Sequence, residues 1–165
     1  MERKTKSSIR LFILIGAVVL LVAICLGGVY MFVQSKPENR INSFLTAIEK
    51  EKYKKAFRYL YCYDENVDTP TELSSDEAYE IWSERVIAVR KGGTYLQSHK
   101  DINITETEDS AYATATLVFD ELGAPRTYKD LEIVLVQIND KWYIADISTE
   151  TVLTYAEEAI SGKMK

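Results

Sequence analysis

Residues 111–119 read Ala-Tyr-Ala-Thr-Ala-Thr-Leu-Val-Phe, and small or apolar side chains alternate there with larger or polar ones. A period of two is typical of a β-strand with one buried face. The face expected to be buried carries Ala111, Ala113, Ala115, Leu117 and Phe119. The other face carries Tyr112, Thr114 and Thr116, joined by Val118. The three alanines predict a shallow trough on the inner face of a sheet.

Strands are expected on both sides of this stretch. The predicted segments are Tyr95–Thr105 before a turn at Glu108-Asp109, Thr127–Ile138 after a loop at 121–125, and Trp142–Ile147 after the tight turn Asn139-Asp140-Lys141. Short turns join antiparallel neighbours. The sequence therefore predicts a curved antiparallel meander of four strands, with five strands as the alternative.

The strand at 127–138 contains Ile133, Val134, Leu135 and Val136, which are apolar on both faces. A strand with two apolar faces is expected to be central, and its outer face is expected to be covered by another element or another protein. The candidates are the last helix, a second copy of the domain, or a partner protein. The candidate interface on this outer face consists of Val118, Val134 and Val136.

Three helices are expected before the sheet, and each has a stripe of apolar residues at helical spacing. The first begins at Pro37 and carries Ile41, Phe44, Leu45 and Ile48; the second carries Tyr53, Ala56, Phe57 and Leu60. In the third, Ser74 and Glu77 form a capping box and Gly92-Gly93 follow the end. Its predicted buried stripe is Ala78, Ile81, Trp82, Val86 and Val89.

A short last helix is expected from Thr149 onward. Its apolar side would carry Val152, Leu153, Ala156 and Ile160, and residues 161–165 are expected to fray. The simplest interpretation of the alanine trough is that the third helix packs closely against it. The alternative is a cavity for a small apolar ligand. That candidate cavity would be lined by Trp82, Val86, Ala113, Ala115, Leu117, Phe119, Ile133 and Leu135.

The N-terminal segment predicts where the protein resides. Residues 1–10 carry Arg3, Lys4, Lys6 and Arg10, and residues 11–33 contain no charged side chain. About 20 apolar residues in a helix cross a bilayer. The positive-inside rule keeps the basic residues in the cytosol, so the rest of the chain is expected outside the cell membrane. An uncleaved single-pass anchor is favoured over a signal peptide, whose apolar core is usually shorter.

The outer part, residues 34–165 including a linker at 34–36, carries 16 basic and 24 acidic side chains, a net charge of −8. This charge argues against nucleic acid as a partner, because phosphates require clustered Lys and Arg. Cys25 lies in the apolar run and Cys62 lies outside it, so the two are not expected to form a disulfide. Cys62 is expected to be a buried small apolar residue.

The order of these elements, with the first helix reading Phe-Leu-x-Ala-Ile and the second Tyr-Lys-Lys-Ala-Phe, resembles the nuclear-transport-factor-2-like superfamily. The closing strand Lys141-Trp142-Tyr143-Ile144, followed by Asp146-Ile147, is similar to the usual last strand of that superfamily. The resemblance covers Pro37–Ser148 and implies a cystatin-like α+β roll, here expected over 37–160. It also implies a bacterial membrane-anchored type, whose members include small envelope proteins, penicillin-binding protein domains and subunits of conjugation machines.

No catalytic constellation is found in the sequence. Enzymes of the resembled superfamily place Asp, His or Tyr inside the cavity of the roll. The sole histidine, His99, shares its predicted strand face with polar residues and is expected to be exposed, and Asp146 is expected to satisfy a backbone group. One histidine and no pair of outer cysteines make no zinc site, so no metal and no cofactor are expected.

The sequence therefore predicts a non-catalytic interaction module of a bacterial cell-envelope complex, associated with secretion, conjugation or the wall. Its partner would be another protein or a second copy, bound through the outer sheet face. One alternative is a sensor or carrier of a small apolar ligand. A second alternative is an isomerase- or hydratase-like enzyme.

Overall fold

The chain divides into two compact units, 1–34 and 35–165. The computed structural model describes residues 36–106, 110–148 and 156–165, all within the second unit. The predicted membrane helix at 11–33, the turn at Glu108-Asp109, and Thr149, Val152 and Leu153 lie outside the described residues. Within the described part of the chain, no helix is both long enough and apolar enough to cross a bilayer.

The predicted antiparallel meander is confirmed. The strands are β1 (Thr94–Glu106), β2 (Ser110–Glu121), β3 (Ala124–Ile138) and β4 (Lys141–Ser148), hydrogen-bonded in the order β1-β2-β3-β4. The loop expected at 121–125 is instead the two-residue turn Leu122-Gly123, and both φ angles there are positive. Asn139 and Asp140 also have positive φ. Turns with two positive φ angles match the twist of the strands that they join.

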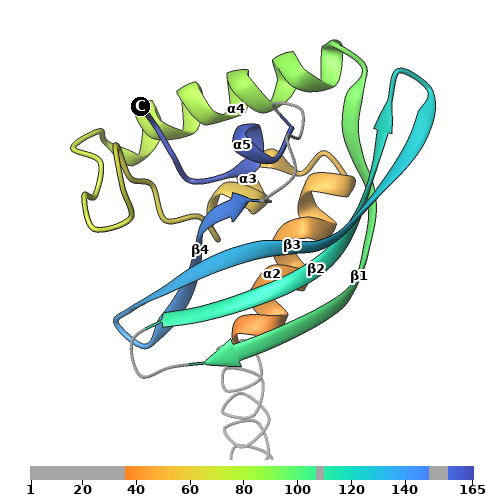
Figure 1. The fold of residues 1–165 in the computed structure, drawn as a ribbon. Helices are drawn as coiled ribbons and strands as arrows, with labels where there is room; N and C mark the ends of the chain where they lie inside the picture. The colour runs from red at the N-terminus through yellow and green to blue at the C-terminus, as the bar shows by residue number, and fades with distance from the viewer. Residues whose placement is uncertain (1–35, 107–109, 149–155) are drawn as a thin grey trace, which may run out of the picture. The chain divides into compact units, whose positions relative to one another are not determined.

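The sheet is strongly curved (Figure 1), and β-bulges explain the bend. Asp101 in β1 and Asp130 in β3 have φ angles of 54° and 56°. The strand register shifts at both residues, on either side of Ala115 and Thr116 in β2. A bulge bends its strand and increases the local twist. Each aspartate follows a lysine, and aspartate accepts the left-handed conformation more readily than most residues.

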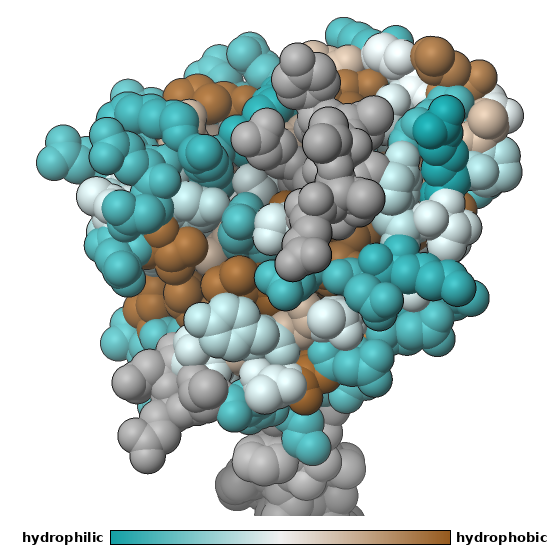
Figure 2. Space-filling model, viewed as in Figure 1, coloured by the Kyte–Doolittle hydropathy of each residue, from teal (hydrophilic) through white to brown (hydrophobic). Residues whose placement is uncertain are grey.

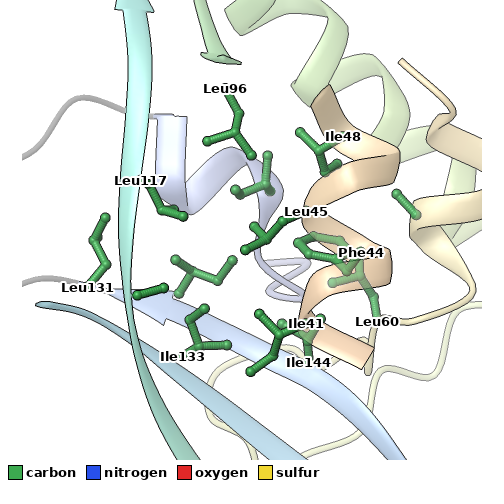
Figure 3. Packing of buried hydrophobic residues seen from close by; sticks show 14 of the residues in the cluster. Ile41, Phe44, Leu45, Ile48, Leu60, Leu96, Leu117, Leu131, Ile133 and Ile144 are labelled. Carbon is green, nitrogen blue, oxygen red and sulfur yellow. The ribbon is translucent and has the colours of Figure 1, made fainter. Parts of the chain in front are cut away.

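The helix α2 (Pro37–Glu49) supplies the central layer of the core. Its stripe at Ile41, Phe44, Leu45 and Ile48 is buried, as predicted. Figure 3 shows these side chains facing the inner side of the sheet, where Leu117, Leu131 and Ile133 lie. The first helix, and not the third, therefore packs against the alanine side of the sheet.

The second helix is shorter than predicted, because the chain joins the edge of the sheet. The helix α3 (Tyr53–Phe57) ends three residues before Leu60, which forms a parallel bridge with Ile144 of β4. The Ile144 N–H donates to the Tyr59 carbonyl, and the Tyr61 N–H donates to the Ile144 carbonyl, both at 2.8 Å. These bonds satisfy the outer edge of β4 better than another helical turn would.

The helix α4 (Ser75–Lys91) begins at the predicted capping box, in which the Ser74 and Glu77 side chains each bond the other residue's backbone N–H. Trp82 and Val86 are buried as predicted. The prediction for Ile81 is wrong, because its side chain is 42 % exposed. The last helix, α5 (Ala156–Ile160), contacts α4 and β4.

The C-terminal segment does not fray. Ser161 is fully buried, the Gly162 N–H donates to the Ala145 carbonyl, and the Tyr63 N–H donates to the Gly162 carbonyl. The Arg85 guanidinium of α4 donates to three carbonyl oxygens here, those of Ala159, Ser161 and Lys163. A β-carbon at position 162 would lie 1.9 Å from the Tyr61 carbonyl oxygen, so glycine is required.

Candidate functional site

All eight residues of the predicted cavity are buried in one hydrophobic cluster. They are Trp82, Val86, Ala113, Ala115, Leu117, Phe119, Ile133 and Leu135. Trp82 packs its ring against Tyr53 and Phe57, at centroid distances of 6.5 and 5.6 Å. In this cluster the alanine face and the side chains of α2 belong to the same core. These positions therefore act as packing residues.

Val86 and Phe119 also line a small cavity between α4, α5 and the inner side of the sheet. Its volume of about 20 Å³ is enough for about one water molecule. Pockets that bind small molecules are usually ten or more times larger, on the order of 300–1,000 Å³. α5 contributes Ala156, Ala159 and Ile160 to this cavity. The buried side of α5 thus faces inward, and α5 is not the cover of the outer sheet face.

Two of the three predicted interface residues lie together on the outer sheet face. Val134 and Val136 are half-buried on β3, with Tyr112 of β2 opposite Val134 and Tyr143 of β4 opposite Val136. Tyr112 is 53 % exposed. We name these four residues the outer patch. In Figure 1 the strands carrying it pass in front of α2, and α2 lies on their far side.

Val118 does not belong to the outer patch. It lies six residues beyond Tyr112 along β2, opposite Thr127 of β3. At about 3.3 Å per residue, six residues span about 20 Å. The register shift between Ala115 and Leu117 bends the strand between the two positions. The bend therefore separates Val118 from Val134 and Val136, although simple alternation along the strands predicted that all three share one surface.

An open groove continues the outer patch past β4, and the sequence did not predict it. Tyr143 and Ile138 form one wall, while Phe57, Tyr61 and Leu73 belong to the other side; its volume is about 430 Å³. Ile138 is 39 % exposed. Figure 2 shows hydrophobic atoms gathered on this face between the loop that follows α3 and the β3–β4 hairpin. The sequence signal that could have indicated this groove is the apolar alternation of β3, which continues to Ile138.

The electrostatics of the groove do not favour nucleophilic chemistry. Cys62 lies in its lining, and burial raises the pKa of the thiol to about 11, although the positive charge of Arg85 opposes the shift. The thiolate is the reactive form of cysteine, and it is scarce at neutral pH when the pKa is this high. Cys62 therefore serves as a small apolar side chain in this groove.

His99 is not exposed, so that prediction is wrong. Only 11 % of its side chain is exposed, and its ring contacts Glu49 and Asn42 of α2. The strand register shifts between Leu96 and Ser98, so two successive residues, Gln97 and Ser98, lie outward and His99 turns inward. A general base needs a ring nitrogen facing substrate. Both nitrogens of His99 are engaged by protein side chains instead.

Asp146 lies opposite Val134 on the outer face, because the register also shifts near Ala145. It is half-buried there and does not share the inner face with Trp142 and Ile144. Within the described ranges, no group of three His, Cys, Asp or Glu side chains has the arrangement of a metal site.

Comparison with known proteins identifies no family. No protein-family model and no curated protein matches the chain. A Nostoc punctiforme protein of unknown function with a cystatin-like fold is 12 % identical, covers 71 % of this chain and 92 % of its own, and has a TM-score of 0.44.

A candidate dehydratase of the NTF2-like family from Streptomyces avermitilis is 15 % identical, with coverages of 64 % and 86 % and a TM-score of 0.42. The fold names of these two structures are those that the sequence resemblance implied. At this level of similarity, neither structure bears on the function of this chain.

Proposed function

We propose that this chain is a non-catalytic interaction module, anchored in a bacterial cell membrane by residues 11–33 and carrying its α+β domain outside. The observation that supports this function best is the outer patch. Val134, Val136, Tyr112 and Tyr143 place apolar surface on one side of a sheet whose other side already holds the core. Aromatic and apolar side chains gathered on one face are typical of protein interfaces.

The charge around the patch narrows the kind of partner. Exposed Glu132 and half-buried Asp146 lie next to Val134, on the outer side of β3 and β4. The domain as a whole is acidic. A partner with an apolar centre and a basic rim would complement this surface, and complementary rims accelerate association and select partners. A partner protein of the envelope therefore fits better than a second copy with the same acidic rim.

Val134→Glu tests the interface. The substitution should abolish crosslinking to the partner, because a charge in a desolvated contact is costly. The free domain should keep its circular dichroism spectrum, since the side chain at position 134 reaches solvent in the monomer. Thr127→Glu is the matched control, because it adds the same charge to an exposed position of the same strand. Unfolding by Val134→Glu, or unchanged crosslinking, would refute the proposal.

The anchor is tested separately. Alkaline phosphatase, which is active only outside the cytosol, should be active when it is fused after Lys165, and the mature protein should retain residues 1–33. Replacing Val19 and Leu20 with arginine should release or degrade the protein, since each arginine costs roughly 2.5–3.5 kcal/mol near a helix centre. A mature N-terminus near Gly28 would show cleavage and end the anchor interpretation.

A further inference from the structure

The open groove past β4 has walls that other contacts hold in place. Phe57 packs its ring against that of Tyr79 of α4, at a centroid distance of 5.3 Å. The segment after α3 is held from two sides, because the Tyr61 N–H donates to β4 and the Cys62 carbonyl accepts from the Thr71 N–H at 3.1 Å. A site with ordered walls binds its ligand without the entropic cost of ordering them. The groove therefore exists before any ligand binds.

The size and lining of the groove suit apolar side chains. Its volume of about 430 Å³ lies within the range of pockets that enclose small ligands, on the order of 300–1,000 Å³. Phe57, Leu73 and Tyr143 are half-buried in its lining, and Ile138 is exposed. Each of these side chains has apolar surface left in contact with water. A ligand that covers this surface gains free energy from its burial.

The segment that leads into α4 gives the groove an acidic border. Residues 64–77 contain six acidic side chains and no basic one. Glu72 lies between two residues of the lining, Asp76 directly follows a third, and both are exposed. Burial raises the pKa of the Tyr61 hydroxyl in the lining, and the negative charge of Asp68 adds to the shift. Three carboxylates therefore lie beside or near the apolar lining.

We propose that the groove binds a short linear segment of the partner protein, in which large apolar side chains are flanked by Lys or Arg. The apolar side chains would fill the lining, and the flanking cations would meet Glu72 and Asp76. Opposite charges at the rim of a contact select partners and accelerate association. The inference rests on the proposed interaction role for the existence of a partner. Tyr143 belongs to both the outer patch and the groove, so one partner can occupy both.

The charges disfavour other occupants of the groove. The carboxylates would repel an anionic lipid surface, and a second copy of the domain would bring the same acidic surplus. A neutral apolar molecule would fill the lining without using the carboxylates. Arg58 is in the lining and Lys141 begins β4, but the three carboxylates outnumber these two cations. A preference for basic flanks therefore distinguishes the proposed ligand from the others.

Photocrosslinking of synthetic peptides tests this preference. Three biotin-tagged peptides share the apolar core Leu-Ser-Leu-Ser-Phe and carry Lys, Gln or Glu residues on both sides. Benzoylphenylalanine replaces Ile138 of the groove in the full chain, held in uncharged detergent micelles at low salt. The crosslinked fraction should be about fivefold higher with the Lys peptide than with the Glu peptide, as expected for a few exposed ion pairs. Equal crosslinking of the three peptides would overturn the proposal.

Two double variants assign the preference to the border of the groove. Glu72→Gln with Asp76→Asn should lower the ratio between the Lys and Glu peptides to about two or less. Glu80→Gln with Glu84→Gln is the matched control, because it removes two charges from exposed positions of α4 outside the lining; it should keep the fivefold ratio. The assay contains no partner protein, so its outcome does not depend on the outer patch. An unchanged ratio in the first variant would refute the groove inference alone, whereas partner crosslinking that survives Val134→Glu would refute the outer-patch role alone.

Discussion

Trp82→Ala is expected to lower the free energy of unfolding by about 3–5 kcal/mol, the usual cost of removing a fully buried large aromatic side chain. Trp82 is completely buried and joins α4 to the rest of the core through its ring contacts with Tyr53 and Phe57. Chemical denaturation of the full chain in micelles, followed by circular dichroism, measures the change. A loss below about 1 kcal/mol would show that α4 is not packed on this core.

Trp82→Phe is the matched control for that substitution. The Trp82 indole nitrogen is buried and has no hydrogen-bond partner among the described residues. Phenylalanine therefore removes no bond within that part of the chain and leaves a smaller gap than alanine does. The expected cost is below about 1.5 kcal/mol, as for other conservative apolar changes. A cost equal to that of alanine would indicate that the indole N–H has a partner.

Arg85→Met is expected to cost about 3 kcal/mol and to release the C-terminal segment. The guanidinium donates to the carbonyl oxygens of Ala159, Lys163 and Ser161, at 3.2, 2.6 and 3.0 Å. Bonds to a charged donor contribute about 1.5–3 kcal/mol each, and bonds that share one side chain do not add fully. Methionine keeps the length of the side chain but cannot donate.

Denaturation and limited proteolysis after Lys163 provide the two readouts for Arg85→Met. Arg90→Met is its control, because Arg90 also lies on α4 but bonds the exposed Glu51 side chain. The control should lose less than about 1 kcal/mol, as exposed ion pairs do. Equal protection of residues 161–165 in the wild type and in Arg85→Met would mean that backbone pairing alone holds the segment.

The elements that local pattern determines could be predicted from the sequence. The alternation at 111–119 and the capping box at Ser74 correspond directly to β2 and to the start of α4. Strand order followed from the short turns. In each case the signal lies within a few neighbouring residues, where steric and hydrogen-bonding preferences act without help from the rest of the chain.

Long-range contacts explain most of the errors. Residues 161–165 look like a polar terminus, yet Arg85, more than seventy positions away, and Tyr63 bind their backbone. Leu60 continues a helical stripe, yet β4 offers its backbone better partners. Neither preference is visible locally, because in both cases the hydrogen-bonding partner comes from a distant part of the chain.

The candidate site was predicted only in part, because local pattern determines some of its residues and distant contacts or register shifts determine the others. Simple alternation placed Val134 and Val136 on the correct face, because the β2–β3 register is continuous between them and the shift between Val134 and Leu135 in the β3–β4 pairing has its extra residue, Ala145, on β4. It failed for His99, because the shift between Leu96 and Ser98 turns that side chain inward. The repeated Lys-Asp step at Asp101 and Asp130 was a usable signal for the later bulges, since aspartate tolerates the left-handed conformation. The groove beside Tyr143 could not be predicted from local pattern, because its other side is formed by the segment after α3, whose path is known only from the folded chain.

Site-specific photocrosslinking in intact cells tests most directly whether the outer patch carries the biological contact. A benzoylphenylalanine placed at Val136 should form a discrete adduct with an envelope protein, and that adduct should disappear when Val134→Glu is introduced into the same chain. The same probe at Thr127 should form no such adduct, because that position lies beyond the bend of the sheet. Equal adducts from both positions, or no adduct from Val136, would contradict the account.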